Sequence, residues 1–129
     1  MRDYQPHKNN PYWLEPTVYK RVLSVVRDYD RMVRDYNNIL HETASGDGQP
    51  RSSTPGDPVE RKAERMDRLW QDIHAVELAL VRVPEQYQKP IMQKVKDDYW
   101  PANVPIGKNG PGYWKKRFLY WVAENKHFV

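Results

Sequence analysis

A run of cations set among aromatic rings is the part of this sequence with the clearest chemistry. The run, GYWKKRFLYWVAENK, covers residues 112–126 and holds Lys115, Lys116 and Arg117 in succession. Long cationic side chains neutralise phosphates, and phenolic hydroxyls can hydrogen-bond to phosphates and to base edges. These residue types indicate contact with a nucleic acid, provided that a helix holds them on an open side.

Helical spacing divides this run into two sides. One side is apolar, and we expect it to pack in the core against Tyr87, Ile91 and Val95. Its members are Trp114, Phe118, Trp121 and Val122. The other side is polar and is expected to be exposed; it carries Tyr113, Lys116, Tyr120 and His127, flanked by Lys115 and Arg117.

The start of the same helix offers a second kind of contact. Its first backbone N–H groups have no intrahelical partner and attract a phosphate, and Lys108 and Asn109 stand just before them. We therefore predict seven DNA-binding residues: Lys108, Asn109, Tyr113, Lys115, Lys116, Arg117 and Tyr120. A helix, a connector and a basic helix follow the logic of a helix-turn-helix, although this connector is about a dozen residues long. An aromatic packing helix with a solvated basic rim is the alternative interpretation.

No arrangement of residues in the sequence indicates catalysis. The histidines at 7, 41, 74 and 127 lack the spacing of metal ligands. The sequence GKNGPG has neither the ending nor the preceding strand of a phosphate-binding loop. Asp97 and Asp98 are more typical of a solvated helix end than of a catalytic pair. We expect no enzymatic activity, no cofactor and no metal site.

The composition fits a small intracellular protein. The chain has 129 residues and no cysteine, so it has no disulfide framework. No apolar run approaches the roughly 20 residues that cross a bilayer, and the N-terminus does not read as a signal peptide. We expect a cytoplasmic protein that does not enter membranes. Residues 1–83 are balanced in charge, whereas residues 84–129 carry the whole net charge of +4, which indicates a scaffold followed by an anion-binding part.

The spacing of apolar residues predicts helices throughout. Residues 1–15 read as an extended N-terminal segment (an N-terminal arm). Residues 16–39 read as one helix with an apolar stripe of Val18, Val22, Val25, Tyr29, Met32, Tyr36 and Ile39. Residues 43–57 are rich in Gly, Ser, Thr and Pro and read as a flexible linker. A capping box at Asp57 and Glu60 starts the next helix, which runs to about residue 81 with a stripe of Val59, Ala63, Met66, Trp70, Ile73, Val76 and Leu80. The two helices predict an antiparallel hairpin over residues 16–83, which could also self-associate through the same stripe.

Residues 84–129 form the predicted DNA-binding region. A helix restarts at Pro84 with Tyr87, Ile91, Val95 and Tyr99 on one face, and Pro90 is expected to kink or split it. Residues 100–112 contain too many prolines and glycines for a helix, and the last helix is predicted near residues 111–126. The fold class is all-α, with a helical hairpin followed by a helix-turn-helix-like pair.

Four segments of the chain resemble, in this order, segments of a family of regulators. They are LEPTVYKRVLSVVRDYDRMVRDYNNIL, GDPVERKAERM, DIHAVELALVRVPEQYQKPIM and YWKKRFLYWVAENKHFV. In them the chain resembles phage late-gene transcriptional regulators of the RinA/ArpU type from Leu14 onward. The resemblance implies a C-terminal part similar to region 4 of sigma factors, with VPEQYQ opening it and the helix at 110–126 in the place of the recognition helix.

Together these features lead us to expect a phage or prophage regulator in the cytoplasm of a bacterial host. By the resemblance we expect it to bind double-stranded promoter DNA, to activate late genes and to contact RNA polymerase. The apolar stripe of the hairpin would allow a homodimer. The competing expectation is a protein-interaction or assembly module, such as a small terminase-like subunit or an inhibitor of a host complex.

Overall fold

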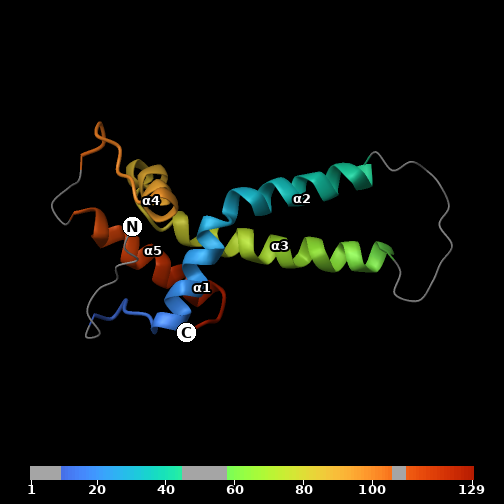
Figure 1. Ribbon diagram of the computed structural model, residues 1–129, viewed down its shortest axis with the longest axis horizontal. Helices are drawn as coiled ribbons and strands as arrows, with labels where there is room; N and C mark the ends of the chain where they lie inside the picture. The colour runs from blue at the N-terminus through green and yellow to red at the C-terminus, as the bar shows by residue number, and fades with distance from the viewer. Residues whose placement is uncertain (1–9, 45–57, 106–109) are drawn as a thin grey trace.

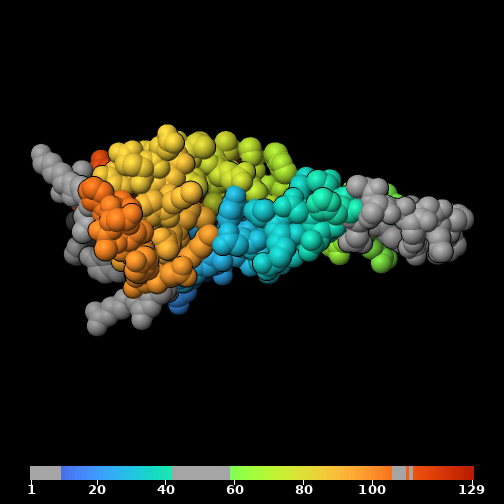
Figure 2. Space-filling view, turned by 90° about the horizontal axis from the view of Figure 1, so that it is seen from above, coloured from blue at the N-terminus to red at the C-terminus, as the bar shows by residue number. Residues whose placement is uncertain are grey.

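The computed structural model describes residues 10–44, 58–105 and 110–129, and these residues form five helices and no strand (Figure 1). The all-α class predicted from the sequence is confirmed. The helices are α1 (Pro16–Arg27), α2 (Tyr29–Ala44), α3 (Pro58–Leu80), α4 (Glu85–Asp97) and α5 (Pro111–Asn125). We call α2 and the part of α3 beside it the arm, and the packed remainder the body. The arm projects from one end of the thicker body (Figure 2).

The single helix predicted for residues 16–39 is wrong, because the chain bends at Asp28 and forms α1 and α2 instead. Asp28 has φ −90° and ψ 0°, and its N–H group bonds to the carbonyl oxygens of Ser24 and Val26. Aspartate is a weak helix former because its side chain competes for local hydrogen bonds, and here Arg31 binds its carboxylate. The bend turns α1 into the body, whereas Met32 and Ile39 of α2 are buried in the arm.

The predicted helix after residue 57 is α3, but its predicted stripe is only partly core. Ile73 and Val76 are buried, whereas Val59 is 72% exposed and Trp70 46% exposed. The outer half of α3 lies beside α2 alone, and a single neighbour covers only one side of a helix (Figure 1). The helix pair that forms is therefore α2 with α3 running in opposite directions, and α1 belongs to the body.

Pro90 does not split the fourth helix. It is buried inside an unbroken α4, beside the buried Ile91, Met92 and Val95. Proline removes one backbone hydrogen bond, and the burial of these side chains offsets that loss. Asp98 ends α4 in the left-handed region with φ 54°, which sends the chain into the connector. In the connector, the indole N–H of Trp100 donates to the carbonyl oxygen of Val104 over 3.0 Å.

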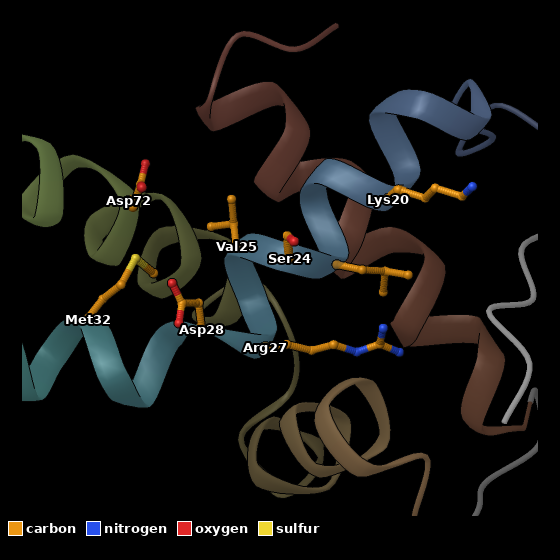
Figure 3. A pocket seen from close by; sticks show the side chains of 8 residues that line it. Lys20, Ser24, Val25, Arg27, Asp28, Met32 and Asp72 are labelled. Carbon is orange, nitrogen blue, oxygen red and sulfur yellow. The ribbon is translucent and has the colours of Figure 1, made fainter.

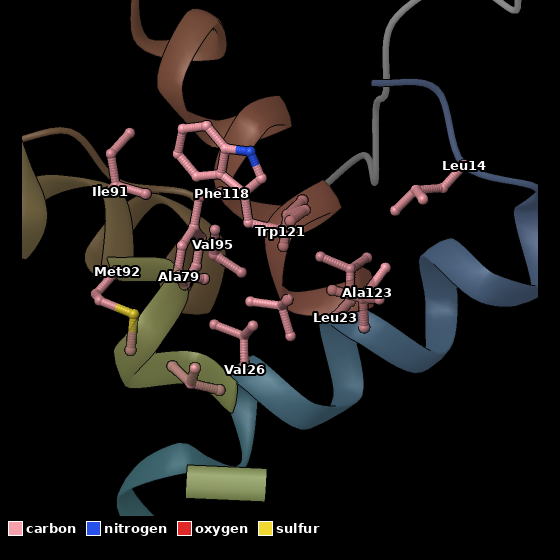
Figure 4. Close-up of a cluster of buried hydrophobic side chains, with 14 of the residues drawn as sticks. Leu14, Leu23, Val26, Ala79, Ile91, Met92, Val95, Phe118, Trp121 and Ala123 are labelled. Carbon is pink, nitrogen blue, oxygen red and sulfur yellow. The ribbon is translucent and has the colours of Figure 1, made fainter. Parts of the chain in front are cut away.

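Helix α5 lies at the centre of the body and packs against α1, α3 and α4. Phe118, Val122 and Ala123 are fully buried, and Leu119 and Trp121 are nearly so. Figure 4 shows Phe118, Trp121 and Ala123 within the core cluster. The predicted core face of this helix is confirmed for Phe118, Trp121 and Val122, and Trp114 packs half-buried against the same cluster. The core takes side chains from α1 and α3, which belong to the predicted hairpin, and from α4 and α5, which belong to the predicted DNA-binding region. It therefore extends across the boundary predicted at residue 83.

Hydrogen bonds fix the helices of the body to one another. The guanidinium of Arg27 donates from Nε to the carbonyl oxygen of Val95 over 3.0 Å, which joins α1 to α4. The amide of Asn125 donates to the carbonyl oxygen of Ala75 over 3.0 Å, which joins α5 to α3. No side-chain nitrogen or oxygen is left buried without a partner in the described part of the chain.

Candidate nucleic-acid interface

The residues predicted to contact DNA do not form an open side of α5. Five of them lie on this helix, and each is half-buried: Tyr113, Lys115, Lys116, Arg117 and Tyr120. Among the side chains predicted for the exposed, polar side of this helix, only that of His127 is exposed, and His127 lies beyond the end of α5. The reason is that α5 is enclosed by three other helices and by the segment that precedes α1. Lys108 and Asn109 lie outside the described residues.

Tyr12, in the segment before α1, covers part of the predicted DNA side. Its ring meets the ring of Tyr120 edge-on, with centroids 5.6 Å apart and planes at 84°. The guanidinium of Arg117 lies over the Tyr12 ring at 4.6 Å and over the Tyr113 ring at 3.5 Å. Arg117 also donates to the carbonyl oxygen of Tyr113 over 3.0 Å. In this arrangement, Arg117 and Tyr120 are engaged within the molecule.

The lysines at the start of α5 lie near the end of α4. A hydrogen bond from Lys94 lowers the pKa of the Asp98 carboxyl group below its ordinary value, and the charge of Lys115 contributes to this shift. The Lys94 ammonium lies 2.9 Å from the carboxylate of Asp98. Lys115 and Lys116 remain candidates for phosphate contact, but Lys115 stands near the carboxylate of Asp98.

A groove between α1, α2 and α3 is a second candidate site, and it is more open than the half-buried side of α5. Three adjoining hollows form it, and Asp72 lines all three. Figure 3 shows one hollow, with Met32 on α2 and Asp72 on α3 on opposite walls and Asp28 between them. The bend at Asp28 creates the groove, because it leads α2 along α3 while α1 turns away from the arm.

Most of the charged side chains that line this groove are cationic. Across the three hollows it contains seven Lys and Arg residues and three Asp residues. The cationic residues are Lys20, Arg21, Arg27, Arg31, Arg65, Arg68 and Lys126. All three acids are already engaged: Arg31 binds Asp28 and Asp35, and Lys126 binds Asp72.

Several groove cations therefore have no acidic partner among the described residues. Arg65 and Arg68 on α3 are exposed and form no ion pair there, and the same holds for Lys20 on α1. Arg21 lies over the ring of Phe128 at 3.9 Å, which orients it without neutralising it. The other three groove cations are engaged: Arg27 donates from Nε to a carbonyl oxygen of α4, and Arg31 and Lys126 are paired with the groove acids. The site is thus a concave surface with a surplus of positive charge.

One acid of the groove, Asp28, has its pKa lowered by its arginine partner. The hydrogen bond from Arg31 lowers the pKa of the Asp28 carboxyl group below its ordinary value, although burial opposes this shift. Arg31 also donates from Nη1 to the carboxylate of Asp35 over 2.6 Å. The exposed Arg31 side chain therefore holds together the end of α1 and the first turns of α2.

The spacing of the arginines contains a signal that the sequence reading missed. Arg61, Arg65, Arg68 and Asp72 follow one another at intervals of four, three and four residues, so they line one side of α3. Arg27, Arg31, Arg34 and Asn38 repeat these intervals. The face with Arg27, Arg31 and Arg34 was interpreted as mixed in sign and solvated. Nothing in the linear order shows that Arg31 and Asn38 of α2 line the same hollow as Arg65 and Arg68 of α3.

The described residues hold no cluster of three or more His, Asp or Glu side chains that could bind a metal ion. Within the same ranges, no helix combines the length and apolar character needed to cross a membrane. Comparison with known proteins finds no matching family model, no matching curated protein and no matching solved structure. The proposals below therefore depend on the residues and their arrangement.

Proposed function

We propose that this protein binds double-stranded DNA and that the groove between α1, α2 and α3 supplies the main contacts to phosphates. The observation that carries the proposal is the surplus of cations in the groove lining, whose three acids are all paired within the chain. Arginine and lysine at a concave surface neutralise the phosphate backbone and fix the protein on the duplex.

The biological role that fits this binding is regulation of transcription. The resemblance to phage late-gene regulators supports a protein that acts at a promoter in a bacterial host cell, as an activator that contacts RNA polymerase. In this proposal the main role of α5 is to form the core of the body. Lys115 and Lys116 add phosphate contacts at its start, and the helix-turn-helix character of α4 and α5 stays a prediction.

Two double substitutions that remove the same charge distinguish the two surfaces. Arg65→Ala with Arg68→Ala alters the groove, and Lys115→Ala with Lys116→Ala alters the start of α5. Affinity for a fluorescent DNA duplex is measured by anisotropy across a series of salt concentrations. Each lost phosphate contact reduces the slope of log K against log salt by about 0.9.

We expect the groove variant to lose affinity and to lower the slope by about 1.8, and the α5 variant to lower it by less. The α5 variant is the matched control, because both variants change net charge by the same amount. Absence of salt-sensitive binding by the parent protein would refute DNA binding itself. A larger effect in the α5 variant would instead show that the C-terminal helix makes the main contacts to DNA.

A further inference from the structure

The side of the arm opposite the groove carries a row of exposed apolar and aromatic side chains. Its centre is Trp70 on α3, which is 46% exposed although tryptophan is among the largest apolar side chains. The Trp70 ring stacks on His74, with centroids 4.4 Å apart and planes at 17°. This stacking holds the indole in a fixed orientation on the surface, as an anchor residue in a protein interface needs.

Residues from both helices of the arm contribute to this face. At about 100° per residue, positions 59, 63, 70, 74 and 81 of α3 and its C-terminal turn fall in one narrow sector, and positions 33, 36 and 40 share a sector of α2. The hydroxyl of Tyr29 donates to Glu77 over 2.5 Å, which shows that the two sectors adjoin. We call this surface the Trp70 face; it consists of Val33, Tyr36, Leu40, Val59, Ala63, Trp70, His74 and Val81, with Leu78 at its edge.

The exposure of the Trp70 face is high for apolar residues. Val59 is 72% exposed, Val81 68%, Leu40 47% and Leu78 45%. Single exposed apolar residues are ordinary, but a contiguous set on one side of a helix pair marks an interaction site. Helix α3 has 23 residues and is about 34 Å long, so the face matches the length and straight shape of a partner helix.

The charges around the face determine which helix it fits. Glu60, Asp67 and Glu77 stand in or beside the apolar sector of α3, and all three are exposed. Arg31, Arg65 and Arg68 lie on the other side, in the groove. Apolar contact surrounded by carboxylates complements an amphipathic helix whose apolar stripe is flanked by Lys or Arg.

We propose that the Trp70 face is a docking site for a cationic amphipathic helix of another protein. A second copy of this chain is a poorer occupant, because pairing α3 with α3 would bring Glu60, Asp67 and their copies to one edge. An anionic membrane surface is a poorer occupant for the same electrostatic reason. The proposal does not depend on DNA binding, since the groove lies on the opposite side of the arm.

The test uses two synthetic helical peptides with the same leucine stripe, one with lysine and one with glutamate at the flanking positions. Binding to the full chain is measured by isothermal titration calorimetry. We expect the lysine peptide to bind at least about tenfold more tightly than the glutamate peptide, since a few complementary surface pairs contribute about 1.4 kcal/mol or more together. Trp70→Ala should weaken lysine-peptide binding by roughly thirtyfold, as truncation of an anchor residue does.

A charge exchange tests the face without touching its apolar centre. Glu60→Lys with Asp67→Lys should reverse the preference, so that the glutamate peptide binds more tightly. Arg65→Ala with Arg68→Ala is a control for charge changes on the opposite side of the arm and should leave the preference for the lysine peptide unchanged. Equal affinity for both peptides, or no binding of either, would overturn the proposal. So would sedimentation that shows self-association abolished by Trp70→Ala, because a second copy would then occupy the face.

Discussion

Replacing Tyr12 by alanine tests whether the segment before α1 fastens α5 in the body. The Tyr12 ring has two aromatic or cationic partners on α5: Tyr120, with centroids 5.6 Å apart, and Arg117, 4.6 Å from the ring centroid. Both partners lie on the side of α5 that the sequence predicts to face DNA. The substitution therefore uncovers this side without removing any residue of the helix.

The expected loss of stability follows from these two contacts. An edge-on aromatic pair contributes about 0.5–1.5 kcal/mol beyond area burial. A cation above a partly exposed ring contributes about 0.5–1 kcal/mol. Tyr12→Ala should therefore lower the free energy of unfolding by about 1–2.5 kcal/mol, a substantial part of the roughly 5–15 kcal/mol typical of a domain.

Urea unfolding of the parent, Tyr12→Ala, Tyr120→Ala and the double variant measures the coupling directly. We expect a coupling free energy of about 0.5–1.5 kcal/mol between the two tyrosines. The same coupling for Tyr12 with Tyr36, a half-buried tyrosine of the arm, is the control and should be zero. A coupling between Tyr12 and Tyr120 that equals the control would refute the packing described for this segment.

The same variant bears on the site of DNA binding. If the groove supplies the contacts, Tyr12→Ala should leave DNA affinity unchanged once the protein is folded. A clear rise in affinity on uncovering Arg117 and Tyr120 would show that α5 reads DNA and that the segment before α1 blocks it. The DNA-binding measurements are made at low temperature and without urea, so that the variant stays folded.

Two further predictions concern the core and the bend. Phe118→Ala removes the largest fully buried side chain and should lower the free energy of unfolding by about 3–5 kcal/mol in urea titration, whereas Tyr99→Ala, at a side chain 52% exposed, should cost far less. Because Arg31 lowers the pKa of Asp28 in the folded state, the stabilisation by this pair is present above the unfolded pKa of about 3.9 and is lost as pH falls through the lower folded pKa. NMR titration should find the Asp28 pKa below its ordinary value, and Arg31→Ala should restore it; an unchanged Asp28 pKa in that variant would contradict the role of Arg31.

The helices were predictable to the extent that local signals define them. Prolines 16, 58 and 111 mark the first residues of α1, α3 and α5, and Pro84 precedes α4. The core side of α5 was also predictable, since Phe118, Trp121 and Val122 recur at helical spacing. The bend at Asp28 was not, because the apolar stripe continues through Tyr29 without a change of period.

The candidate site was less accessible to sequence reasoning because it depends on tertiary contacts. The cations at 115–117 were conspicuous as a run, yet enclosure by other helices and by Tyr12 leaves them half-buried. The groove cations come from α1, α2, α3 and the end of the chain, and Arg65 and Lys20 stand 45 positions apart in the sequence. Counting charges along the chain placed the surplus of positive charge after residue 83. In the folded protein the acids before residue 83 that line the groove are paired, and this leaves groove cations before residue 83 without an acidic partner.

The central position of α5 has a consequence for how the chain reaches its native state during synthesis. Residues 118–123 complete a core whose other walls, α1, α3 and α4, are translated earlier. Until this stretch has left the ribosome, the core sides of α1, α3 and α4 lack one of the helices that cover them, and the nascent chain exposes apolar surface of the kind that chaperones recognise. The pairing of α2 with α3 needs no such delay, so the arm can form first and the body can close around α5 afterwards.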